Sequence, residues 1–109
     1  MHFAEDAINM LAQNISIPEE AIVDFCKGHK INNLAFFGSI LGANFQPESD
    51  VDVLVEFETG YAPGFDFFSM QEELSEIIGR QVELHTPNFL SPHFRDNVIK
   101  EAQVLYAAS

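Results

Sequence analysis

The chain has little positive charge. Only five of its 109 residues are Lys or Arg, against seventeen Asp or Glu, and its formal net charge is −12. A surface of this charge repels a phosphate backbone, so we expect no direct binding of DNA or RNA. A basic protein partner is compatible with this charge. A compact charged ligand is also compatible, because a divalent cation can neutralise carboxylates locally.

Cysteine is equally scarce, and long apolar runs are missing. The single cysteine, Cys26, excludes an intrachain disulfide and fits a reducing cytoplasm. No apolar run approaches the roughly 20 residues of a membrane span, and residues 1–6 lack the basic region of a signal peptide. We therefore expect a cytoplasmic protein with no membrane contact. The length predicts one domain over residues 1–109, with a Phe-rich core.

Short apolar runs alternate with amphipathic stretches along the chain. Short apolar runs bounded by turn residues, or alternation at period two, predict strands, and amphipathic stretches with terminal signals predict helices. The expected helices cover residues 1–15, 16–28, 65–78 and 92–101, and the expected strands cover residues 33–38, 50–57, 81–85 and, at an edge, 103–106. This alternation indicates an α/β (α+β) fold, with a small mixed β-sheet packed with helices.

Phenylalanine is concentrated near the start of the third predicted helix. The side chains of that helix that we expect to point mostly inward are Phe67, Phe68, Met70, Leu74, Ile77 and Ile78. Phe65, Phe67 and Phe68 could also form a partner-binding patch, although core packing is the default for such residues.

Two acidic residues stand two positions apart in the predicted strand 50–57. Their side chains leave the same face of the strand, so Asp50 and Asp52 are neighbours in space. The two charges repel unless water solvates both or a cation lies between them. Hard cations such as Mg²⁺ prefer carboxylate oxygens and usually keep a phosphate oxygen as well. Alone, the pair is better explained as a solvated strand end.

Gly38 and Ser39 end the strand before the acidic pair. Glycine lets a backbone approach a phosphate closely, and a Ser hydroxyl beside a helical turn supplies donors, although Ser39 could simply cap that turn. Glu83 completes a three-carboxylate cluster if its strand lies beside the acidic pair. An exposed strand residue is the alternative for Glu83. His85 shares the face of Glu83, but we interpret it as a half-exposed residue outside the site.

The spacing of these residues resembles a known signature. Gly38 and Ser39, ten intervening residues and then the pair Asp50 and Asp52 look like the motif of the polymerase-β-like nucleotidyltransferases. The short length and the apolar run before Gly38 are most similar to the minimal nucleotidyltransferase (MNT) domains, with the motif core over residues 33–86. Glu83 matches the place where that family carries its third acid. Together, the spaced motif and the third acid are more specific than either alone.

The resemblance implies a chemistry for each of these residues. In that family the three acids bind two Mg²⁺ ions, so Asp50, Asp52 and Glu83 would be the metal ligands and the catalytic residues. The implied nucleotide-binding residues are Gly38, Ser39 and Ser49. The nucleotide donor implied by the family is ATP. Two metals roughly 4 Å apart neutralise phosphate charge and activate an acceptor oxygen, which nucleotidyl transfer requires.

The same resemblance implies a partner. MNT domains commonly act as antitoxins encoded beside a HEPN-domain ribonuclease toxin, and they resemble enzymes that transfer AMP from ATP to a toxin tyrosine. The expected function is therefore Mg-dependent adenylylation of a HEPN partner. The alternative is a catalytically weak MNT antitoxin that neutralises its toxin by binding alone. The family motif is usually Gly-Ser-x-Ala-Arg-Gly. At the last three positions of that motif, this chain has Leu41, Gly42 and Ala43 instead. The missing arginine favours the alternative, whereas the intact acids favour the enzyme.

Overall fold

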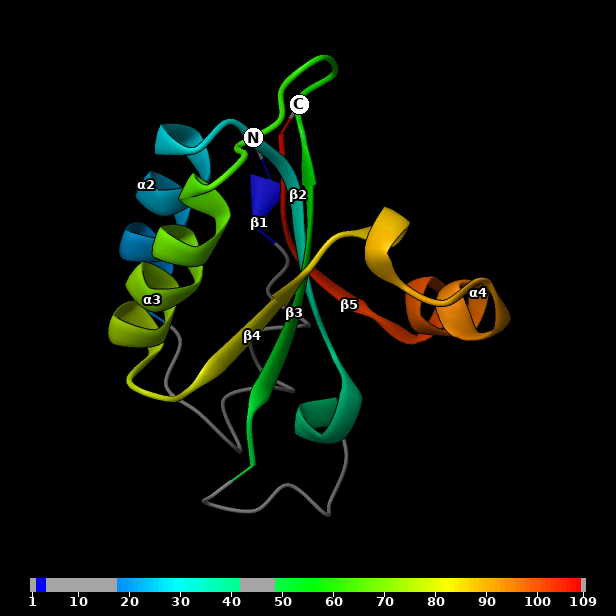
Figure 1. The fold of residues 1–109 in the computed structure, drawn as a ribbon. Helices are drawn as coiled ribbons and strands as arrows, with labels where there is room; N and C mark the ends of the chain where they lie inside the picture. Colours follow the sequence, from blue (N-terminus) through cyan, green and yellow to red (C-terminus); the bar gives the residue numbers. More distant parts are fainter. Residues whose placement is uncertain (1, 4–17, 42–48, 109) are drawn as a thin grey trace.

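A five-stranded mixed sheet forms the centre of the protein. The computed structural model describes residues 2–3, 18–41 and 49–108 (Figure 1). The strands are β1 (His2–Phe3), β2 (Ile31–Phe37), β3 (Val51–Phe57), β4 (Val82–His85) and β5 (Gln103–Ala107), in the order β1-β5-β2-β3-β4. All neighbouring strands are antiparallel except β3 and β4, which are parallel. The predicted α/β fold with a mixed sheet is confirmed.

Helices cover one face of this sheet more fully than the other. The helices are α2 (Glu19–Gly28), α3 (Asp66–Ile78) and α4 (Pro92–Glu101), and two short 3₁₀ helices, η1 (Gly38–Leu41) and η2 (Pro87–Phe89), follow β2 and β4. In Figure 1, α2 and α3 lie side by side on one face of the sheet, whereas α4 lies on the other side. None of the helices in the described ranges is long and apolar enough to cross a membrane.

Terminal signals in the sequence explain where the helices begin and end. Pro18 precedes α2, whose first turn is acidic and whose last turn carries Lys27, in agreement with the helix dipole. Gly79 caps the C-terminus of α3 with φ +80°, a left-handed conformation that glycine adopts without steric cost. Ser91 accepts a hydrogen bond from the backbone N–H of His93 at the start of α4.

The core lies between the sheet and the pair α2 and α3. Val51, Val53 and Val55 of β3 are fully buried, and they pack with residues of both helices such as Ile22 and Met70. Because strand side chains alternate, the residues between these valines face the opposite side of the sheet. The face that carries Asp52 is therefore the face that α2 and α3 leave uncovered.

Two predictions about the edges of the sheet were wrong. His2 and Phe3, predicted to be helical, form β1 and pair with Ala107 and Tyr106 of β5; the remainder of the predicted helix 1–15 lies outside the described residues. The strand predicted at an edge, β5, therefore lies between β1 and β2. A strand of two residues is too short to show any hydrophobic period, so the pattern of the sequence could not reveal it.

One predicted core residue of α3 is on the surface. Phe68 is 70% exposed, whereas Met70, two positions later, is fully buried. Each residue of an α-helix turns by about 100°, so these two side chains point in nearly opposite directions. Only one of them can face the sheet, and that residue is Met70.

Candidate active site

The parallel pairing of β3 and β4 brings two predicted site residues together. Asp52 stands directly opposite Glu83 in the register of these strands. The backbone N–H of Val51 donates to the carbonyl of Gln81 over 2.8 Å, which closes the ladder at this end. Both acidic side chains lie on the face away from α2 and α3, because the apolar residues that flank them in each strand are buried: Val51 and Val53 in β3, and Val82 and Leu84 in β4.

His85 joins this pair. One ligand atom from each of Asp52, Glu83 and His85 lies within 4.8 Å of the others. We call these three residues the acid–histidine cluster. The Nε2 atom of His85 lies 3.4 Å from Asp52 Oδ1 and 3.8 Å from Glu83 Oε2. Our sequence interpretation left His85 outside the site, although its spacing of two from Glu83 was a usable signal for a shared face.

Desolvation and charge crowding together raise the pKa of Glu83. The main cause is desolvation of its carboxylate, followed by the negative charges of Asp52 and Asp50 and by a side-chain hydrogen bond with Asp50, while His85 acts in the opposite direction. Asp50 therefore acts on the cluster, although it is exposed and stands one residue before β3. A bound cation would relieve this repulsion, and the oxygen-rich donor set suits a divalent ion.

Gly38 lies against the cluster at the end of β2. It has φ +82°, and a Cβ atom built on it would be 2.5 Å from Asp52 Oδ2. Glycine is therefore required here by its backbone conformation and by the close approach of the carboxylate. Ser39 lies in η1, and its side chain is outside what the structure describes.

The backbone of Ser49 is held in place beside the site. Its carbonyl accepts a hydrogen bond of 3.0 Å from Arg80 Nη2. Arg80 stands just before β4, so it ties the residue that precedes Asp50 to the strand that carries Glu83. This positioning contact had no signal in the sequence, because it depends on which strands pair.

We expect Glu83→Gln to stabilise the metal-free protein. Because the raised pKa means that folding favours protonated Glu83, stability is lost as the pH rises through that pKa. Glutamine stays neutral and removes this loss. In EDTA at pH 8, Tm should rise by about 1–5 °C, a range set by the partly solvated position of Glu83.

The matched control for this measurement is Glu56→Gln. It removes the same charge from an exposed position of the neighbouring strand, β3. If both variants raise Tm equally, the gain comes from the net charge, and the local crowding at Glu83 is refuted.

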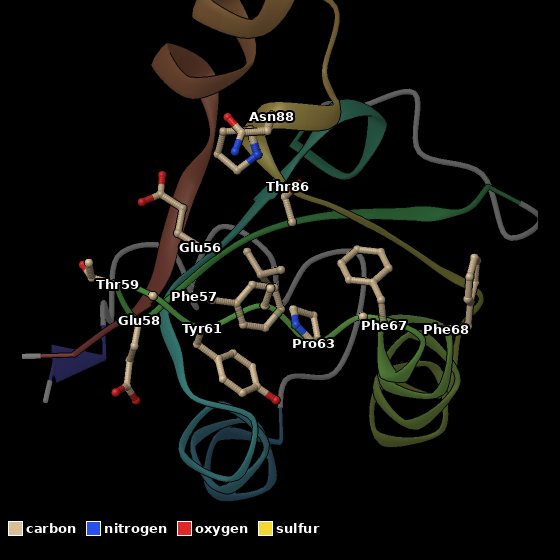
Figure 2. Close-up of a pocket in the computed structure, with 15 residues that line it drawn as sticks. Glu56, Phe57, Glu58, Thr59, Tyr61, Pro63, Phe67, Phe68, Thr86 and Asn88 are labelled. Carbon is tan, nitrogen blue, oxygen red and sulfur yellow. The ribbon is translucent and has the colours of Figure 1, made fainter.

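A second feature, an apolar groove, lies at the opposite end of β3. It has a volume of about 1030 Å³. The lining residues run from Val55 to Gly64, with Phe67 and Phe68 of α3 and with Thr86, Pro87 and Asn88 after β4. Figure 2 shows the rings of Phe57, Tyr61 and Phe67 around the groove, with Glu56 and Glu58 to one side. None of the three residues of the acid–histidine cluster lines the groove, although Thr86, which does, directly follows His85.

Comparisons with known proteins identify the class to which this arrangement belongs. The family model described as "Polymerase beta, Nucleotidyltransferase" matches residues 20–109. The chain belongs to this family and carries its minimal nucleotidyltransferase form. One solved structure carries the provisional name of a minimal nucleotidyltransferase. It is 30% identical to this chain and superimposes with a TM-score of 0.64, covering 77% of this chain and 85% of that one.

Two relatives come from Methanocaldococcus jannaschii and are provisionally named protein adenylyltransferases. One is 30% identical over 82% of this chain and 95% of its own length. The other is 30% identical over 72% of this chain and 78% of its own length. A toxin–antitoxin structure with AMP-PNP has the same fold, with a TM-score of 0.69 and 17% identity over 85% of this chain and 76% of that one.

Proposed function

We propose that this protein transfers AMP from ATP to a hydroxyl group of a partner protein in the cytoplasm, in a reaction that depends on divalent metal ions. The observation that carries the proposal is the position of Asp52 in β3, opposite Glu83 of β4 and, at the end of the pairing with β2, beside Gly38. Membership of a nucleotidyltransferase family supports the reaction class. The provisional names of the two archaeal relatives support a protein as the acceptor.

The residues fit the metal ions that the family uses. The crowded carboxylates give the site spare negative charge. The buried Nε2 atom of His85, which has no hydrogen-bond partner among the described residues, is a further donor. Asp50, Asp52 and Glu83 would hold the metal, expected to be two Mg²⁺ ions. When bound, these ions neutralise charge on the phosphates and lower the pKa of the acceptor hydroxyl.

The chain's own groups have distinct tasks in this reaction. Gly38 and Ser39 hold the β- and γ-phosphates, and Ser49 orders the segment before Asp50. The acceptor oxygen forms a bond to the α-phosphorus as the bond from that phosphorus to the bridging oxygen breaks, and pyrophosphate leaves. Glu83 takes the hydroxyl proton, a task that a carboxylate can perform as a general base.

We propose a HEPN toxin as the partner. Two observations support a toxin: the fold is shared with toxin–antitoxin structures, and the net charge of −12 suits a basic, RNA-cleaving protein.

The test of the reaction uses the product of the neighbouring gene, a divalent metal and ATP labelled at either the α- or the γ-phosphate. We expect label on the partner from α-labelled ATP only. Transfer of the γ-label would indicate a kinase and contradict the proposal.

The apolar groove favours a second candidate function, neutralisation by binding alone. Phe68 lines the groove and is 70% exposed, and Phe65, at the N-terminus of the same helix, is 93% exposed. The acidic residues Glu56 and Glu58 beside these rings favour a segment of the partner that is apolar and basic. The absence of label on a partner that still forms a complex would support this candidate.

We expect Phe68→Ser to weaken the complex with the partner about 30-fold, since an aromatic anchor is worth about 2 kcal/mol at an interface. The control is Ile99→Ser, which removes an exposed apolar side chain, 48% exposed, from α4. Calorimetric titration measures both affinities. Equal affinities for the two variants would exclude the groove as the docking site. Loss of self-association in Phe68→Ser would instead assign the groove to a second copy of this chain.

A further inference from the structure

His85 is not among the three residues to which the proposed function assigns the metal. Its Nε2 atom is shielded from solvent and lies within ion-pair distance of Asp52 and Glu83, but it forms no hydrogen bond of acceptable geometry with the described residues. Buried polar atoms without a partner are rare in folded proteins, and a bound ion is one physical reason for such an atom. This nitrogen points into the acid–histidine cluster, where it lies close to Asp52 Oδ1 and Glu83 Oε2.

The two distances from His85 to the carboxylates suit ligands of a single ion. Two atoms that each lie about 2.1 Å from one metal are at most about 4.2 Å apart. The distances from His85 Nε2, 3.4 Å to Asp52 and 3.8 Å to Glu83, fall within that limit. The ring of Phe37 packs edge-on against His85, with centroids 5.2 Å apart, and this contact restricts the orientation of the imidazole.

We propose that His85 is a metal ligand beside Asp52 and Glu83, and that its nitrogen makes this site prefer Mn²⁺ to Mg²⁺. The inference rests on the metal site of the proposed function. Mg²⁺ is a hard ion that takes oxygen ligands and keeps much of its water. Imidazole suits first-row transition metals, and a mixed set of one nitrogen and two carboxylates accommodates Mn²⁺ without excluding its water ligands.

Pulsed EPR of Mn²⁺ added to the purified protein tests this ligand directly. A directly bound imidazole gives a hyperfine coupling to ¹⁴N, which we expect in the wild type and not in His85→Gln. The control is His29→Gln, since His29 pairs with Glu73 over 3.1 Å and lies next to α2. Because the wild-type spectrum alone decides whether nitrogen is bound, the test stands even if the variant folds poorly. Mn²⁺ bound without ¹⁴N coupling would overturn the inference.

Calorimetric titration of each metal tests the preference. We expect the wild type to bind Mn²⁺ at least about tenfold more tightly than Mg²⁺, and His85→Gln to lose about tenfold in Mn²⁺ affinity while its Mg²⁺ affinity is unchanged. Equal losses for both metals would contradict the preference, and His85→Asn repeats the comparison with a shorter amide.

The outcomes separate this inference from the proposed function. If wild type binds neither metal, both fail, because the carboxylates then form no metal site. If Mn²⁺ binds with ¹⁴N coupling but no AMP reaches the partner, the ligand assignment stands and the transfer reaction is rejected.

Discussion

Asp52→Asn should reduce the transfer of AMP to the partner by about a hundredfold or more. Asparagine keeps the shape of the side chain but removes the charge that a divalent ion needs. Lewis-acid stabilisation by a bound metal is worth several kcal/mol, and every 1.36 kcal/mol is a factor of about ten in rate. The rate is measured in a single turnover with α-labelled ATP.

This variant should keep its complex with the partner. Asp52 lies at the other end of β3 from the apolar groove, so its charge is not needed for docking. Asp24→Asn is the matched control, because Asp24 is exposed on α2, on the covered face of the sheet. Equal rates for Asp52→Asn and the wild type would remove Asp52 from the reaction.

Gly38→Ala should weaken metal binding about 10- to 100-fold, the range seen when a metal ligand loses its supporting contacts. The new methyl group would stand 2.5 Å from Asp52 Oδ2, so the carboxylate must move away from the position shared with Glu83 and His85. The φ of +82° adds about 1–2 kcal/mol of backbone strain for any residue with a Cβ.

Gly60→Ala separates these two effects. Gly60 has φ +84°, and no atom of the described residues lies within 4 Å of a Cβ built on it. Both variants should lose similar stability in thermal unfolding, but only Gly38→Ala should lose metal affinity by calorimetric titration. If both bind metal like the wild type, the close approach of Gly38 has no role in shaping the site.

The strands that build the site follow from local patterns in the sequence. The valines of β3 alternate with Asp52, and those positions alone predict one buried and one open face. Glycine and proline near the helix termini likewise predicted where α3 and α4 end and begin. The fold class was therefore accessible, because each element carries its own period.

The contacts between strands were not accessible in the same way. Glu83 can meet Asp52 only because β4 pairs in parallel with β3, a choice made by packing between distant segments. His85 joins them for the same reason, so its imidazole could not be assigned from spacing alone. The resemblance to a nucleotidyltransferase motif pointed to the three acids. The motif contains no histidine, so it could not indicate that His85 lies beside them.

The groove was the least predictable feature. Its walls come from the segment after β3, the start of α3 and the segment after β4, which approach each other only in the folded chain. Phe68 was predicted to be a core residue by its apolar character, yet its position on the helix turns it outward.

Anomalous scattering from crystals grown with Mn²⁺ and a non-hydrolysable ATP analogue tests the central claim, that the acid–histidine cluster is the metal site of a nucleotidyltransferase. The account predicts a manganese peak in contact with Asp52, Glu83 and His85, with the phosphates of the analogue beside Gly38. Ordered nucleotide with no manganese peak at these three residues would contradict it.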